Sequence, residues 1–193
     1  MGKLAASFAL AYPAVRLDVA TEDRPVVMVD EGYDLAIRVN PAPDANLVGR
    51  IILRDRLAVV APPGLARPAD GAAVPAVVRG AAAGPSSLSW TVKDDGAPIA
   101  IDPVLRLSSL IMVRDAVRAG VGAACLSVSL VSYGISTGRL AHWGDLDTPE
   151  IAIWALYPSR RLLSTRVSAF LEHLKAAFPQ GTPEELAAHI DAL

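Results

Sequence analysis

The stretch DLAIRVNPAPDANLVGR, from Asp34 to Arg50, decides the fold of this chain. It opens with the apolar run Leu35 to Val39, which is typical of a short strand. Pro41 and Pro43 then break the chain into a turn, because proline cannot continue the hydrogen bonding of a central strand. Apolar residues return at Leu47, so we expect a second strand after the turn.

The composition is that of a globular chain. Of its 193 residues, 52% are hydrophobic and 20% are charged, which suits one or two α/β cores and is too apolar for a disordered tail. The formal net charge is −2, and the 18 basic residues form no Lys/Arg-rich run that could neutralise a row of phosphates. Direct DNA binding by this polypeptide is therefore not expected.

Cys125 is the only cysteine, which makes a disulfide within the chain impossible. Its surroundings, GAACLSV, predict a small buried hydrophobe rather than a ligand or nucleophile. The first residues, MGKLAASFALAY, resemble a signal peptide, but the run is too short to span a bilayer. Because Leu4, Phe8 and Ala11 share one helical face before Pro13, we expect a core helix there and a cytoplasmic protein.

Strands alternate with helices along the chain, which is the pattern of α/β folds with largely parallel sheets. A half-buried strand is expected from Val15 to Ala20, and a short helix from Pro25 to Glu31 that ends at Gly32. The stretch from Pro68 to Pro85 is rich in alanine, glycine and proline without clear periodicity, so it is expected to be a surface loop with at most one short helix.

The remaining elements follow from the same signals. Ser89 to Val92 and Pro98 to Ile101 predict a hairpin around an Asp-Asp-Gly turn. An amphipathic helix is expected that is capped by Ser108 or Ser109 at its start and ends at Gly120, and another is expected after Ser164. Further strands are expected at 51–53, 57–61, 104–107, 123–126 and 151–157, and a helix at 183–192 is expected to be a surface appendage.

Two of these strands, Leu57 to Ala61 and Ile151 to Tyr157, are interpreted as crossings between two lobes. The expected first lobe comprises 1–58 plus 154–193, and the second comprises 59–153. In open α/β sheets, ligands bind outside the carboxyl ends of strands, where helix N-termini meet. We therefore expect a ligand in a cleft between the lobes.

Three hydroxyls lie at such positions. Thr21 stands at a strand end before a helix, and Ser108 and Ser109 stand at the equivalent point of the second lobe. A hydroxyl beside unpaired backbone N–H groups suits the carboxylate or phosphate of a small anion, because the helix dipole adds positive potential. The alternative is that all three are ordinary N-caps, each stabilising its helix by about 1 kcal/mol and touching no ligand. The residues leave both alternatives open.

Catalysis has little support in the sequence. It contains no Gly-x-Ser-x-Gly elbow, and His142, His173 and His189 have no partner at metal-ligand or triad spacing. The run from Gly120 to Gly122 follows a helix and precedes a strand, which is the reverse of a dinucleotide-binding loop. We expect no enzyme activity, no metal and no cofactor.

Several stretches resemble, in the same order, the effector-binding part of LysR-type transcriptional regulators. They are Glu31-Gly32-Tyr33 followed by DLAIRV, the turn with Pro43, Asp44, Leu47 and Val48, LSSLIMVRDAVRAGVGAACL from Leu107 to Leu126, GRL from Gly138 to Leu140, and ALYPSRRLLSTRVSAFLEHL from Ala155 to Leu174. The resemblance implies a two-lobed, periplasmic-binding-protein-like (type II) α/β fold with two crossover strands. It also implies that a winged helix-turn-helix, a linker helix and the opening strand of the domain are missing here.

The resemblance also implies a site and partners. Effector contacts are expected at Thr21, Arg38, Ser108, Ser109, Ser127 and Val128, and relatives usually have proline after the strand that ends near Ser127. Arg38 has an alternative, because an arginine in a strand can instead pair with a carboxylate such as Asp34 or Asp44. A homodimer or tetramer is expected through Leu4 to Tyr12 and the region after Ser127. DNA is expected to be bound only through the absent N-terminal domain, and no membrane is involved.

The expected function is sensing of a small, anionic organic metabolite by a transcription regulator, through a shift between open and closed arrangements. Two alternatives stay open. One is a free-standing solute-binding protein with the same two-lobed architecture, which the lack of an export signal disfavours. The other is a truncated, non-functional remnant of a regulator.

Overall fold

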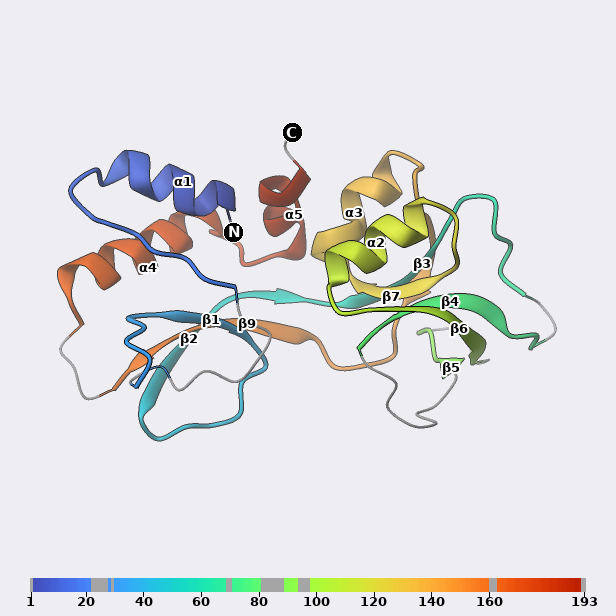
Figure 1. Cartoon of the computed structure of the whole chain (residues 1–193), viewed down its shortest axis with the longest axis horizontal. Coiled ribbons are helices and arrows are strands. Elements are labelled where there is room, and N and C mark those ends of the chain that lie inside the picture. Colours follow the sequence, from blue (N-terminus) through green and yellow to red (C-terminus); the bar gives the residue numbers. More distant parts are fainter. Residues whose placement is uncertain are drawn as a thin grey trace. The chain divides into compact units, whose positions relative to one another are not determined.

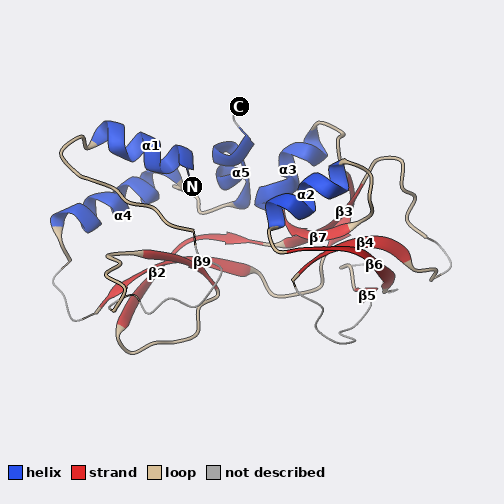
Figure 2. Ribbon diagram, viewed as in Figure 1, coloured by secondary structure: helices blue, strands red, loops and turns tan. Residues whose placement is uncertain are grey.

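The computed structural model describes residues 2–21, 28, 30–68, 71–80, 89–93, 98–159 and 163–191 (Figure 1). The chain divides into two compact units, and each contains both strands and helices (Figure 2). The first unit comprises Met1–Asp55 with Ile151–Leu193, and the second comprises Arg56–Glu150. The chain therefore passes between the units twice.

The first unit is built on an antiparallel sheet with the strand order β1-β9-β2. Its strands are β1 (Ala36–Val39), β2 (Leu47–Asp55) and β9 (Ile151–Pro158). The two strands predicted between Asp34 and Arg50 are confirmed, and both pair with β9 rather than with each other. Asn40, at φ 41°, holds the end of β1 against β9: its N–H donates to Ala152 O (2.9 Å) and its Oδ1 accepts from Ala152 N (2.8 Å).

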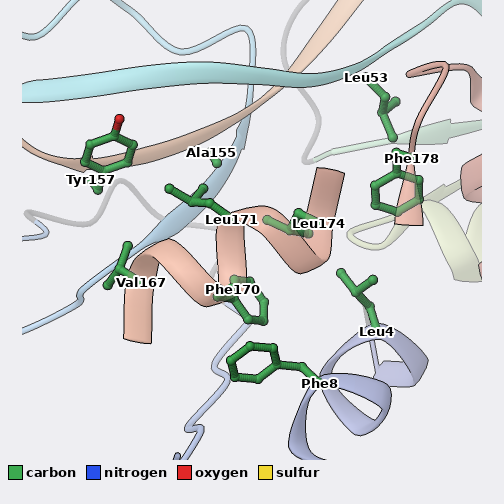
Figure 3. Close-up of a cluster of buried hydrophobic side chains, with 10 residues drawn as sticks. All are labelled: Leu4, Phe8, Leu53, Ala155, Tyr157, Val167, Phe170, Leu171, Leu174 and Phe178. Atoms are coloured by element: carbon green, nitrogen blue, oxygen red, sulfur yellow. The ribbon is translucent and has the colours of Figure 1, made fainter. Parts of the chain in front are cut away.

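Helices α1 (Gly2–Ala11), α4 (Thr165–Ala177) and α5 (Pro183–Asp191) complete the first unit. A buried cluster joins α1 and α4 to β2 and β9 (Figure 3). It contains Leu4, Phe8, Leu53, Ala155, Tyr157, Val167, Phe170, Leu171, Leu174 and Phe178. The rings of Phe8 and Phe170 meet edge to face with centroids 4.9 Å apart. The core helix predicted near the N-terminus is confirmed.

Helix α5 is more than the surface appendage that was expected. Ala187 is buried, and Leu186 packs against the cluster. The ring of His189 lies 5.1 Å from the ring of Phe178, measured between centroids. The helix contributes one leucine and one alanine to the core, which is too few large apolar residues to predict a buried face from the sequence.

The strand expected from Val15 to Ala20 is absent. These residues are irregular, and although Val15 packs against the cluster, Leu17 and Val19 are exposed. Alternating side chains form a strand only where a neighbouring backbone accepts the hydrogen bonds, and no segment within the described ranges pairs with this one. The helix expected from Pro25 to Glu31 lies mostly outside the described residues; at its expected end, Gly32 has φ 76°.

Two three-stranded sheets, with the orders β4-β6-β5 and β7-β3-β8, contain the strands of the second unit that lie in the described residues. They are β3 (Leu57–Ala61), β4 (Val74–Arg79), β5 (Ser89–Trp90), β6 (Ile99–Leu107), β7 (Ala124–Ser127) and β8 (Ala141–Asp145). Strands β4 and β6 are parallel, whereas β5-β6, β7-β3 and β3-β8 are antiparallel. A parallel bridge between Ala76 and Ala123 joins β4 to the start of β7. There Ala123 N donates to Pro75 O and Val77 N to Ala123 O, each at 2.8 Å.

Strand β4 corrects the surface loop expected between Pro68 and Pro85 over Val74–Arg79, and residues 69–70 and 81–85 of that stretch lie outside the described ranges. Val74, Ala76 and Val77 are buried, with β6 on one side and β7 on the other. The prediction was wrong because Pro75 argued against a strand. The proline is tolerated there because its nitrogen, which has no hydrogen to donate, faces the start of β7, and only its carbonyl accepts a hydrogen bond from that side. The predicted hairpin is confirmed as β5 paired with β6, and β6 is one strand that runs through Pro103. Its turn lies partly outside the described residues.

Two helices flank β7. Helix α2 (Leu110–Arg118) is the predicted amphipathic helix, with Val113 and Val117 buried, and Gly120 ends it at φ 93°. Helix α3 (Val128–Ser136) follows β7 directly and is not among the predicted elements. Its sequence, VSLVSYGIS, is rich in β-branched residues and serine, which are weak helix formers.

Candidate effector site and family relationship

Three parallel strands of the second unit end at one edge of its sheet, and two helices begin there. Strands β6, β4 and β7 run in the same direction, so their carboxyl ends lie together. Ser108 and Ser109 link β6 to α2, and Ser127 ends β7 immediately before α3. With one strand between them, β6 and β7 lie roughly 10 Å apart. The structure therefore brings Ser108, Ser109, Ser127 and Val128 to the same sheet edge.

The serines at this edge are N-caps by position but not by hydrogen bonding. Ser109 and Ser127 have the extended backbone of an N-cap, yet neither hydroxyl makes a cap hydrogen bond. In contrast, the hydroxyl of Ser164 at the start of α4 accepts from Val167 N at 3.4 Å. The first N–H groups of a helix have no partner within the helix. The start of α2 therefore offers amides and two serine hydroxyls, because Ser108 beside it is exposed.

Neighbouring strands add charge to this edge. The Nε of Arg79, at the end of β4, donates to Ser108 O at 3.4 Å. Strand β3 starts at this edge because it is antiparallel to β7, and β8 ends there. Asp145 links Arg56 Nε and His142 Nε2, each at 2.9 Å. The edge thus combines helix amides with two arginines and one carboxylate that already has partners.

Val128 is placed differently from the expectation for an effector contact. Its side chain is only 5% exposed, and its N–H donates to Arg56 O at 2.9 Å. The side chain therefore belongs to the core of the second unit, and one of the first amides of α3 is already used.

The two remaining predicted contacts, Thr21 and Arg38, lie in the first unit. Thr21 is exposed and irregular, and the residues that follow it lie outside the described ranges. Arg38 is in β1 opposite Trp154, on the face of the sheet away from the buried cluster. The two carboxylates considered for Arg38 have other contacts: Asp34 with Arg166 (3.1 Å) and Asp44 with the N–H of Asn46 (2.8 Å).

The histidines and the cysteine have structural surroundings. His173 Nε2 lies 2.8 Å from Ser7 Oγ, and His189 Nδ1 lies 3.1 Å from Glu185 O. Burial in β7 raises the pKa of the Cys125 thiol from 9.0 to about 11, which favours the unreactive protonated form. Within the described residues, no three His, Cys, Asp or Glu side chains are grouped to hold a metal ion. In that same part of the chain, no helix is long and apolar enough to cross a bilayer.

Residues 1–179 match the family model described as the LysR substrate binding domain. The chain belongs to this family. Curated relatives of this LysR domain include the HTH-type transcriptional regulator CrgA of Neisseria meningitidis, 29% identical over 90% of this chain and 61% of the relative. Another is DmlR of Escherichia coli, 29% identical over 95% of this chain and 62% of the relative. The LysR domain thus spans less than two thirds of these regulators.

A solved structure supports the same fold. The CrgA regulatory domain matches the LysR domain with a TM-score of 0.76 at 24% identity, covering 92% of this chain and 91% of that domain. The expected two-lobed, periplasmic-binding-protein-like α/β fold is therefore confirmed.

Sequence reasoning located the serines of the LysR domain but missed two features of the edge. Arg79 reaches Ser108 because β4 is a strand, and that strand was hidden by Pro75. Helix α3 was missed because its sequence favours a strand as much as a helix. Its abrupt start at Val128 had one local signal, a serine after an apolar strand, which is also what a loop offers.

Proposed function

We propose that this chain is the effector-sensing domain of a LysR-type transcription regulator and that it binds a small organic anion. The observation that carries the proposal is the pair of helices, α2 and α3, that begin at one sheet edge with serine hydroxyls unused as caps. A carboxylate at a helix N-terminus gains typically 0.3–1 kcal/mol from the dipole alone, and hydrogen bonds to amides and hydroxyls add to this. Membership of a substrate-binding family supports the assignment.

The ligand class follows from the chemistry of this edge. Backbone N–H groups, hydroxyls and arginine side chains all donate hydrogen bonds, so the ligand supplies acceptors. Two donor groups about two strand spacings, or roughly 10 Å, apart suit a molecule with a carboxylate at one end and a second acceptor at the other. The proposal keeps Thr21 and Arg38 as effector contacts. It also keeps two functional lobes, 1–58 plus 154–193 and 59–153.

The test measures binding of small anions to the purified chain. A panel of mono- and dicarboxylates, with the matching amides as uncharged controls, is screened by thermal shift and followed by calorimetry. We expect a carboxylate to raise the melting temperature and its amide to have no effect. The double variant S109A/S127A should reduce affinity about a hundredfold, since each of the two lost hydrogen bonds to a charged group is worth about 1.5 kcal/mol.

A matched serine keeps this test specific. Ser136 lies at the other end of α3, where its hydroxyl donates to Tyr133 O at 3.0 Å. The variant S136A should bind the same carboxylate as tightly as the wild type. Equal affinity in S109A/S127A and wild type would refute the assignment of the site.

We propose further that the domain self-associates. Leu4 and Phe8 are buried within their own unit, which leaves Leu10 (84% exposed) as the large apolar residue that α1 offers to another molecule. In the second unit, Ile111 (55%) and Met112 (50%) are exposed on α2, and Tyr133 is exposed on α3. We expect a dimer by light scattering. The variants L10D and M112D should weaken it, so that it dissociates at a higher protein concentration than the wild-type dimer does.

The whole regulator is proposed to contact DNA through a part of the protein outside these residues and to act in the cytoplasm. The support is that the relatives are HTH-type transcriptional regulators of which this chain spans about three fifths. Relatives of this kind are regulators rather than enzymes. The readout that tests this is effector-dependent DNA binding by the full-length protein, compared with the isolated domain, which should not bind DNA.

A further inference from the structure

The outer edge of β2 in the first unit carries backbone groups that no described segment uses. Asn40 N donates to Ala152 O, so the backbone groups of residue 152 in β9 point toward β1. Because successive residues of a strand point their backbone groups to opposite sides, residues 152, 154 and 156 face β1, and residues 153, 155 and 157 face β2. Gly49 is opposite residue 156 and Ile51 is opposite residue 154. The N–H and C=O groups of Gly49 and Ile51 therefore point away from β9.

Contacts at both ends of β2 agree with this assignment. The register shifts by one residue between Ile51 and Leu53, so Arg54 is opposite Ala152 and its N–H also points outward, where it donates to Gly181 O at 2.9 Å. At the other end, Leu47 N donates to Asp44 O at 3.1 Å. As far as the described residues show, the edge is closed at its two ends by the chain's own loops and unpaired between them, over Gly49 to Ile51.

A hollow of about 100 Å³ lies beside this open edge, between β2 and α4. Its apolar lining consists of Ile51, Ile52, Ala155, Leu171, Leu174 and Phe178. In Figure 3, Leu171 and Leu174 of α4 lie on the side of the sheet that carries Ala155. A hollow of this size suits one branched aliphatic side chain.

The rim of the hollow is positively charged. Arg50 is directly opposite Ala155, so its side chain lies on the helix face of the sheet, and Lys175 projects from α4. Both are exposed, and neither has a hydrogen bond or ion pair within the described residues. Glu172 is the one acidic residue that lines the hollow in that part of the chain. Two cations with no partner beside an apolar hollow favour an acidic ligand with an apolar anchor.

We propose that this groove, formed by the open β2 edge and the hollow beside α4, docks an extended, acidic segment of a partner protein as an added antiparallel strand. The spacing supports a strand, because Gly49 and Ile51 present their backbone groups at the two-residue period of a β-ladder. Pairing in this sheet is antiparallel throughout, which sets the direction. An aliphatic side chain of the segment fills the hollow, and acidic residues two positions either side of it meet Arg50 and Lys175.

The probe is a capped, fluorescein-labelled peptide with the sequence TETLTET, whose leucine and glutamates share one face when it is extended. Fluorescence anisotropy with the whole chain should give saturable binding that weakens with added salt. The peptide TKTLTKT should bind about tenfold more weakly, because its lysines meet Arg50 and Lys175. The charge-reversal variant R50E/K175E should invert this preference. The variant R16E, which changes an exposed cation that does not line the hollow, should leave it unchanged.

Backbone methylation separates a strand from a side-chain contact. In the proposed register, the threonines beside the leucine donate their N–H groups to the β2 edge, and the leucine N–H points to solvent. N-methylation of those threonines should lower affinity about tenfold, and N-methylation of the leucine should have little effect. The proposal is overturned if TETLTET does not bind, if both charge forms bind equally, or if methylation of the threonines has no effect. None of these outcomes bears on the serines of the proposed effector site, Ser108, Ser109 and Ser127, which are in the second unit.

Discussion

Replacing Gly122 by alanine tests whether the junction of β4 and β7 positions the proposed effector edge. A Cβ at this residue falls 2.3 Å from Pro75 O and 2.7 Å from Pro75 C, and both are backbone atoms with little freedom to move. To restore van der Waals contact, the strands must separate by about 1 Å, which breaks the two 2.8 Å bonds between Ala123 and its neighbours Pro75 and Val77. Two lost backbone bonds at about 1 kcal/mol each, with 1–2 kcal/mol of overpacking, give about 3–4 kcal/mol.

The assay is thermal and urea unfolding of G122A beside wild type, where a loss of this size lowers the melting temperature by about 10 °C. The control is G64A in the same unit, because a Cβ at Gly64 meets nothing within 4 Å. It should change stability by less than about 0.5 kcal/mol. Since Ser127 follows this junction by a few residues, G122A should also weaken carboxylate binding. Wild-type stability in G122A would refute the reasoning, because it would mean that β4 and β7 are not joined here.

Three further predictions concern single side chains. F8A should cost about 3–5 kcal/mol in urea unfolding, because it empties the contact between α1 and α4. N40A should cost about 1–2 kcal/mol, since it removes the bond from Ala152 N and leaves alanine at a positive φ, whereas N46A should cost less. Burial raises the pKa of Cys125 to about 11, so above pH 9 the thiol stays protonated in the native state and loses its proton in the unfolded state. The free energy of unfolding should therefore fall between pH 9 and 11. C125A should flatten that decline in unfolding free energy measured against pH.

Elements with a local signal were predictable from the sequence. Helix α2 has apolar residues at helical spacing between a serine and Gly120, and α4 has a serine cap that the structure uses. The two strands between Asp34 and Arg50 are separated by prolines, which fix the turn whatever the strands pair with. These features depend on residues within a few positions of each other.

The errors arose where structure depends on distant residues. β4 is a strand because β6 and the residue before β7 supply hydrogen bonds on both sides, and this outweighs the proline within it. The segment from Val15 to Ala20 has the better strand pattern, yet no described neighbour pairs with it. A local pattern therefore predicts a capacity for pairing, and the partner decides whether a strand forms.

The candidate site shows the same division. The sequence placed Ser108 and Ser109 where a strand ends and a helix begins, but it could not decide between capping and binding, because both interpretations use the same residues. The structure adds that neither the Ser109 nor the Ser127 hydroxyl makes a cap hydrogen bond. The approach of Arg79 and Arg56 to this edge follows from strand pairing across separations that no local pattern encodes.

Strand direction explains why the two proposed sites differ in kind. In the second unit, β6, β4 and β7 are parallel, so each strand end is followed by a connection on the same edge, and the amino ends of α2 and α3 concentrate donors there. In the first unit, β9 is antiparallel to both neighbours, so strand ends alternate between edges, and the one helix start with a described cap, at Ser164, has its hydroxyl occupied. In that antiparallel sheet, the outer edge of β2 is the one that the described residues leave unpaired between Gly49 and Ile51. A parallel sheet thus favours a small anion at its strand ends, and a short antiparallel sheet favours another strand.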